Sequence, residues 1–142
     1  MVRRRKSILA VICYILSLYG FNAAQAESCV SATDTDRVAA AIGKLSDYYD
    51  VPPLTACNGS SSRIERLICQ NRTLKIMESL DTKSYVYAFE NATKEATNHK
   101  RPVVDKDWIT KVRDRCIDID YLCDAMKSHT NDSLGGESPY QK

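Results

Sequence analysis

Five cysteines constrain the fold of this chain more than any other feature of its sequence. They lie downstream of residue 26, at Cys29, Cys57, Cys69, Cys116 and Cys123. In an oxidising compartment an even subset of them is expected to pair, and such cross-links help a small hydrophobic core to hold together. Because five is an odd number, one thiol is left over, either free or paired with another chain.

Residues 1–26 have the features of a signal peptide for export. Arg3 to Lys6 form a basic cluster, residues 8–19 are apolar, and Ala24-Gln25-Ala26 is a small-x-small cleavage site. The apolar run is shorter than the roughly 20 residues that a membrane-spanning helix needs. We therefore expect cleavage before Glu27 and a periplasmic or secreted product that has no membrane attachment.

Removal of the leader changes the sign of the net charge. The 142-residue precursor has 20 Lys and Arg against 18 Asp and Glu, and the leader contains four of the basic residues and no acidic one. The mature chain therefore has 16 basic and 18 acidic residues, a net charge of −2. The basicity of the precursor gives no reason to expect nucleic-acid binding, and the mild acidity of the mature chain favours a cationic partner.

Hydrophobic spacing predicts helices throughout and no strands. Residues 33–49 repeat apolar side chains at intervals of three and four, and Pro52 and Pro53 end that pattern. Ser62 and Glu65 form a capping box that starts a second helix near residue 63. Asn71 interrupts it, and a long helix follows over 73–97.

A polar break at 98–102 separates this helix from a third long one that opens at Asp105. Its apolar face includes Trp108, and Ile119, Leu122 and Met126 continue the pattern. We expect an all-α fold, a small disulfide-braced antiparallel hairpin or bundle with a short N-terminal helix. The predicted division is a signal peptide over 1–26, an extension with a short helix over 27–54, a helical domain over 55–127 and a disordered tail over 128–142.

The preferred disulfide pairing closes two local loops, Cys57–Cys69 and Cys116–Cys123, and crossed pairings are the alternative. Cys116 and Cys123 are seven residues apart, which is about 10 Å along an unbroken helix. That separation exceeds the roughly 7 Å limit for a disulfide, so this pair requires a turn between its members. Cys29 is then unpaired or joins two chains, and a dimer through Cys29 is one expectation.

Residues 55–127 contain an ordered set of cysteines, charged residues and aromatics. The set runs Cys57, Glu65-x-x-Ile68-Cys69, Leu74, Met77, Tyr85, Trp108, Arg113-Asp114-x-Cys116 and Cys123. In this order it resembles the LprI-type lysozyme-inhibitor family, formerly a domain of unknown function. The resemblance implies an exported helical domain that binds and blocks lysozyme-like muramidases, and it gives Glu65, Trp108 and Arg113 as signature residues.

The residues themselves suggest structural roles for this signature. Glu65 is interpreted as a helix cap and Trp108 as a core residue. Arg113 either pairs with Asp114 or is solvated.

Asp118, Asp120 and Tyr121 are the predicted partner-binding residues. Lysozymes of the C type are cationic and act through two carboxylates in a cleft. A rigid acidic loop laid over such a cleft would exclude the substrate and complement its basic rim. In the alternative interpretation, the two acids only solvate a helix face.

The sequence contains no pattern typical of catalysis. It has no G-x-S-x-G, no H-E-x-x-H, no glycine-rich phosphate loop and no C-x-x-C repeat. His99 and His129 lie in polar stretches and are interpreted as incidental. We therefore predict a non-catalytic protein without a cofactor or a metal, either a muramidase inhibitor or a structural or interaction factor of the envelope.

Four N-glycosylation sequons, at Asn58, Asn71, Asn91 and Asn131, would also fit a glycosylated or host-directed secreted protein. The leader and the family resemblance favour a bacterial periplasmic protein instead.

Overall fold

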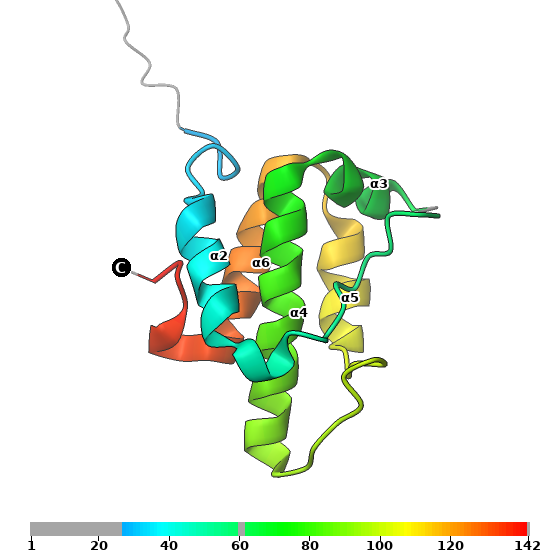
Figure 1. Cartoon of the computed structure of the whole chain (residues 1–142). Coiled ribbons are helices and arrows are strands. Elements are labelled where there is room, and N and C mark those ends of the chain that lie inside the picture. Colours follow the sequence, from blue (N-terminus) through cyan, green and yellow to red (C-terminus); the bar gives the residue numbers. More distant parts are fainter. Residues whose placement is uncertain (1–26, 60–61, 142) are drawn as a thin grey trace, which may run out of the picture.

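The structure, a computed structural model, describes residues 27–59 and 62–141, and the predicted signal peptide lies outside these ranges. In the described part the chain is entirely helical (Figure 1). The elements are α2 (Thr35–Lys44), η1 (Ser46–Tyr48), α3 (Arg63–Gln70), α4 (Arg72–Thr93), α5 (Lys106–Lys111), η2 (Arg113–Arg115), α6 (Ile119–Leu134) and η3 (Gly135–Glu137). Two disulfides brace the helices. The predicted all-α, disulfide-braced bundle is confirmed.

The N-terminal helix is shorter than the sequence predicts. α2 begins after Asp34, whose side chain accepts hydrogen bonds from two backbone N–H groups of the first turn. The helix ends at Lys44, and the single turn η1 follows. Leu45 leaves helical geometry there and redirects the chain. As a result Tyr49, predicted on the apolar face, is 82% exposed.

The capping signals ahead of α3 and α4 act as predicted. Ser62 and Glu65 form a reciprocal capping box at the start of α3. Asn71 ends α3 and caps α4, because its side-chain oxygen accepts a hydrogen bond from the backbone N–H of Leu74. Each cap satisfies backbone donors that the first turn of a helix leaves without a partner.

The third long helix that we expected after Asp105 is divided into two. α5 ends at Lys111, and η2 and an extended Cys116 separate it from α6. Asp118 begins α6 by accepting a hydrogen bond from the N–H of Tyr121. A residue that competes for backbone N–H groups in this way starts a new helix rather than continuing an old one.

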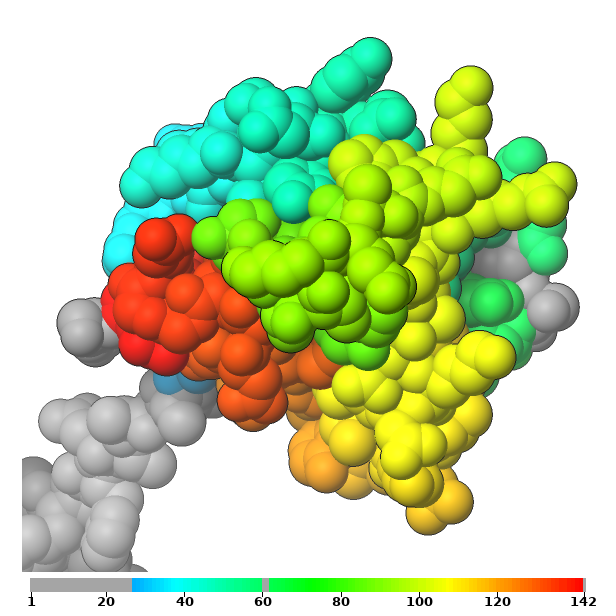
Figure 2. Space-filling model, turned by 90° about the horizontal axis from the view of Figure 1, so that it is seen from below, coloured from blue at the N-terminus to red at the C-terminus, as the bar shows by residue number. Residues whose placement is uncertain are grey.

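The prediction of a disordered tail over 128–142 is wrong for the part that is described. α6 continues to Leu134, and His129, Thr130 and Ser138 are buried. The prediction failed because it required an apolar period, whereas these buried positions are polar and hydrogen-bonded or packed within the bundle. Figure 2 shows the C-terminal segment in red, lying against α2 in cyan.

α4 and α6 run in the same direction rather than antiparallel. Cys123 contacts Met77, and one to two turns further along both helices His129 contacts Asp81. The chain returns between them through residues 94–118, which include α5 and η2 (Figure 1). This connection is long enough to go back along α4, so the expected hairpin is replaced by a parallel pair with a return segment.

α4 is the central element, and α2, α3 and α6 pack around it. Buried side chains gather in two clusters: Ile64, Ile68, Leu74, Met77, Cys116, Leu122, Cys123 and Met126, and then Val38, Ala41 and Leu80. The second cluster joins α2 to α4, so residues 27–54 belong to the same bundle as the predicted 55–127 domain. None of the described helices is both long and apolar enough to cross a bilayer.

Candidate functional site

The predicted partner-binding residues lie together in an exposed stretch, residues 117–121, which we name the contact segment. Its apolar side chains are unusually exposed: 71% for Ile117, 36% for Ile119 and 54% for Tyr121. Only one other large hydrophobic side chain in the described residues, Tyr49, is exposed. Asp118 and Asp120 alternate with the apolar residues and are exposed as well.

The backbone of the contact segment is held at several points. Arg63 of α3 donates hydrogen bonds to the carbonyl oxygens of Cys116 and Ile117. The Asp118 side chain accepts from the N–H of Tyr121 at 2.7 Å and caps α6. Asp120 accepts a hydrogen bond from the N–H of Val30 at 3.4 Å. Both predicted acids therefore have structural partners, while the three apolar side chains face outward.

A disulfide anchors α6 directly behind this segment, and it is not the one that we expected. Cys123 bonds to Cys29, 94 residues away, rather than to Cys116. Cys116 is a buried free thiol that contacts the Val112 carbonyl oxygen. The preference for Cys116–Cys123 was wrong because sequence spacing does not reveal that residues 28–33 cross over α6.

The other predicted disulfide, Cys57–Cys69, is confirmed. Two disulfides indicate an oxidising environment for the folded chain. Because Cys29 is bonded within the chain, it has no thiol for a dimer. Burial raises the pKa of the Cys116 thiol, which keeps it protonated and poorly nucleophilic.

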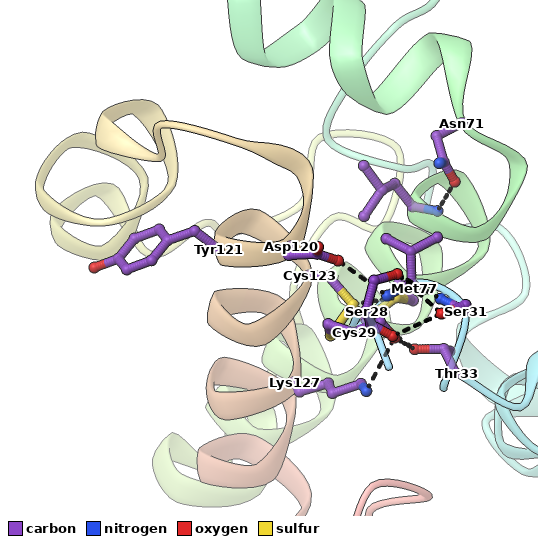
Figure 3. Close-up of a disulfide and its surroundings, with 12 residues drawn as sticks. Ser28, Cys29, Ser31, Thr33, Asn71, Met77, Asp120, Tyr121, Cys123 and Lys127 are labelled. Atoms are coloured by element: carbon purple, nitrogen blue, oxygen red, sulfur yellow. Dashed lines mark hydrogen bonds between the residues drawn. A yellow bond between two sulfur atoms is a disulfide. The ribbon is translucent and has the colours of Figure 1, made fainter. Parts of the chain in front are cut away.

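Residues 28–33 form an N-terminal strap over the start of α6 (Figure 3). Besides the disulfide, Lys127 donates to the carbonyl oxygen of Cys29 at 3.5 Å. Thr33 donates to the same carbonyl at 2.7 Å. Figure 3 shows Tyr121 directed away from the disulfide, whereas Asp120 points toward the strap. The strap thus braces one side of α6 and leaves the Tyr121 side chain exposed.

The three signature residues have structural roles. Glu65 completes the capping box of α3. Arg113 is buried and pairs with Asp114 at 2.9 Å and with Glu78 at 3.5 Å. Trp108 packs against the larger core cluster from α5. The ion pair of Arg113 with Asp114 was one of the two predicted alternatives, whereas the Glu78 contact was not foreseen.

α4 buries an unusual number of polar and charged side chains. Glu78 accepts hydrogen bonds from the N–H and the hydroxyl of Thr55, and burial raises its pKa against the lowering effects of these bonds and of Arg113. Lys83 donates to three backbone carbonyls between residues 48 and 51, and burial lowers its pKa. These buried groups therefore link the central helix to the 46–55 segment.

His129 is the principal feature that the sequence reasoning missed. Its Nδ1 lies 2.9 Å from a carboxylate oxygen of Asp81, and its Nε2 lies 3.6 Å from Asp105. The ring stacks on Trp108, with 4.2 Å between centroids, and on Tyr85, with 5.5 Å between centroids. Leu122, Met126 and His129 are spaced by four and three, so the apolar stripe of α6 extended to His129 would have indicated its burial.

Two carboxylates set the charge of this histidine. Burial alone would lower the pKa of His129, but the hydrogen bond and charge of Asp81, with the charge of Asp105, raise it overall. Burial raises the pKa of Asp81, which His129 and Thr130 partly oppose. The pair is a buried charge-assisted link between α4 and α6, and Asp105 connects α5 to it.

The space beside His129 is too small for an organic substrate. The cavity lined by Tyr85, Trp108, Ile109 and His129 has a volume of about 20 Å³, which is close to the space of one water molecule. Among the described residues no group of three or more His, Cys, Asp and Glu side chains is arranged to hold a metal ion.

His99 is also engaged, at the surface. Its Nδ1 lies 2.9 Å from Asp50 and its Nε2 lies 3.3 Å from Glu90. The ring lies over Tyr48, with 5.1 Å between centroids. The hydrogen bond to Asp50 raises the pKa of His99, and the charge of Glu90 adds to it. The prediction that both histidines are incidental is therefore wrong.

Comparison of the chain with protein-family models, with curated proteins and with solved structures found no match. The resemblance to the LprI-type family stays a prediction from the sequence.

Proposed function

We propose that the mature chain is a non-catalytic periplasmic binding protein that inhibits a lysozyme-like muramidase by laying the contact segment over its cleft. The observation that carries this proposal is the concentration of exposed apolar side chains. Ile117, Ile119 and Tyr121 lie within five residues, and Tyr121 is directed outward. Aromatic and aliphatic anchors of this kind supply most of the binding energy in protein interfaces.

Rigidity supports the same proposal. Arg63, the Asp118 cap and the Cys29–Cys123 disulfide hold the segment before any partner arrives. A segment that is already ordered loses less conformational entropy on binding than a flexible one. An ordered segment is suited to blocking an enzyme cleft, because it keeps its shape when it contacts the enzyme.

Exposed carboxylates on the α6 side of the segment favour a cationic partner, while the bordering cations Arg63 and Arg115 lie at its N-terminal end. Asp118, Asp120 and Asp124 are exposed on or next to it. Such rim charges mainly accelerate encounter and select the partner, while the apolar anchors slow dissociation. A C-type lysozyme, with its basic rim, fits this pattern. The sequence resemblance to lysozyme inhibitors points to the same class of target.

The test measures muramidase turnover on cell walls with increasing amounts of the purified, oxidised protein. Tyr121→Ala should weaken inhibition by about ten-fold or more, which corresponds to about 1.4 kcal/mol of binding free energy. Tyr49→Ala is the matched control, since it also removes an exposed tyrosine but lies outside the segment. Asp118→Asn removes a charge and keeps a capping oxygen, so it should mainly slow association.

Two results would overturn different parts of the proposal. If no lysozyme-like muramidase is inhibited by the folded protein, the target class is wrong. If inhibition occurs and Tyr121→Ala leaves it unchanged, the contact lies elsewhere on the surface.

A further inference from the structure

The structure contains a second surface with binding character, distant in sequence from the contact segment. A groove of about 700 Å³ lies between α2 and the C-terminal segment that follows α6. Its apolar and small lining residues are Ala40, Ala41, Leu45, Leu134, Gly136 and Pro139. A groove of this size exceeds the gaps left by ordinary side-chain packing and falls in the range of binding sites.

Two cations border this groove on the α2 side, and the one acid in its lining, Glu137, belongs to the opposite, C-terminal side. Arg37 and Lys44 both line it and are seven residues apart, so they lie on the same side of the helix about 10 Å apart along its axis. Neither side chain forms an ion pair with another residue of the described part. Between them Ala40 and Ala41 leave the helix surface low, which allows close approach.

We propose that this groove binds an acidic amphipathic helix of a partner protein. A helix lying along α2 presents two carboxylates seven residues apart at the same spacing as Arg37 and Lys44. Small apolar residues between those acids then face Ala40, Ala41 and Leu134. This is the helix-in-groove mode of peptide recognition, with the charges fixing the register. The surface is independent of the contact segment, so the muramidase proposal does not affect it.

The experiment uses the full mature protein and a labelled synthetic helical peptide that has two Glu residues seven apart with Ala and Leu between them. Fluorescence anisotropy should show saturable, salt-sensitive binding with one peptide per chain. A second peptide of the same composition, with the two Glu residues five apart, should bind about two- to five-fold more weakly, since only one of its carboxylates can then reach a cation while the apolar contacts are kept.

Variants of the protein test separately the contribution of the two cations and the need for an open groove. Arg37→Gln with Lys44→Gln should weaken binding of the first peptide by about five-fold or more, and Arg72→Gln with Lys75→Gln is the control that removes the same charge from α4. Gly136→Phe should block the groove while preserving the fold, because a Cβ at Gly136 meets no atom within 4 Å and the residue has no left-handed φ. Circular dichroism confirms that each variant is folded.

The proposal is overturned if the two peptides bind equally, if the control pair weakens binding as much as the groove pair, or if Gly136→Phe has no effect. Binding of laurate, tested as a simple anionic amphiphile, without binding of the peptide would also overturn it and would identify the groove as a small-ligand site. Specific binding of the first peptide, reduced by both groove variants, supports it.

Discussion

The two disulfides fasten the same bundle over very different lengths of chain. Cys57–Cys69 joins residues 12 apart, at the edge of the molecule where Cys57 is exposed. Cys29–Cys123 joins residues 94 apart, and Cys123 is fully buried in the larger core cluster. The first bond orders a loop beside α3, whereas the second holds the N-terminal strap against α6. The comparison shows that one disulfide stabilises a local loop, whereas the other attaches the N-terminal strap to the last long helix of the bundle.

The largest expected effect comes from removing the long-range bond. Cys29→Ala with Cys123→Ala should lower the free energy of unfolding by about 4–5 kcal/mol, because a loop of this length restricts the unfolded chain most. Urea unfolding followed by circular dichroism measures it. Cys116→Ala belongs in the reference and in the variant, so that no replacement disulfide forms.

Peptide mapping of the oxidised protein provides the direct check of this first prediction. A Cys116–Cys123 peptide in place of Cys29–Cys123 would reverse the comparison, because both cross-links would then be local.

Removal of the local bond should cost less. Cys57→Ala with Cys69→Ala is expected to lower the free energy of unfolding by about 3 kcal/mol, since the closed loop is much shorter. The same urea titration, in the same Cys116→Ala background, gives the value. A loss equal to or larger than that of the long-range pair would show that loop length does not rank the two bonds.

The same division between near and distant contacts explains what the sequence could predict. Ser62, Glu65 and Asn71 were placed correctly because a cap involves residues within one turn of each other. Cys57–Cys69 was placed correctly for the same reason. These features depend on chain geometry over a few residues, which the sequence contains directly.

Contacts that close the bundle were missed because they depend on the path of the chain. The strap that brings Cys29 to Cys123 and the return segment that makes α4 and α6 parallel leave no local pattern. His129 was missed for a related reason. Its place on the apolar stripe of α6 indicates burial, but the partner that makes this burial favourable, Asp81, lies on another helix and the sequence does not bring the two together. For the candidate site, Asp118, Asp120 and Tyr121 were named from the sequence. The exposure of Ile119, predicted on the apolar face, and the structural use of both acids were not foreseen.

The two histidines offer a similar comparison, because His129 pairs with its carboxylates in the core and His99 pairs with its carboxylates near the surface. His129→Leu should lower the free energy of unfolding by about 2 kcal/mol at neutral pH, because Asp81 stays buried and loses its main partner. His99→Leu should cost less than about 1 kcal/mol, since Asp50 is solvated when the ring is gone and Glu90 keeps its two hydrogen bonds from Thr97. Thermal and urea unfolding of the two variants measure the difference.

Both histidines lie between two carboxylates and against an aromatic ring, so equal losses would show that burial does not set the ranking. Near-ultraviolet circular dichroism should change for His129→Leu alone, because its ring is stacked on Trp108.

The smallest expected effect is the pH dependence of the surface link. The hydrogen bond to Asp50, with the charge of Glu90, raises the folded-state pKa of His99 above its usual value of 6.5. A raised pKa means that the folded state binds the proton more tightly. The stabilisation is therefore complete below about pH 6.5 and is lost as the pH rises through the folded-state pKa. Its size should stay within the 0.2–1 kcal/mol of an exposed ion pair, approximately.

Subtraction isolates this contribution from the buried histidine, whose pKa is shifted in the same direction. The difference in unfolding free energy between the wild type and His99→Gln should fall toward zero as the pH rises through the raised folded-state pKa of His99. His129 is present in both proteins, so its titration cancels in the difference. A difference that grows with pH would mean that neutral His99, not the imidazolium, makes the stronger contacts with Asp50 and Glu90. The contacts of His99 with Asp50 and Glu90 would then be ordinary hydrogen bonds, and only His129 would form a charged pair with its carboxylate.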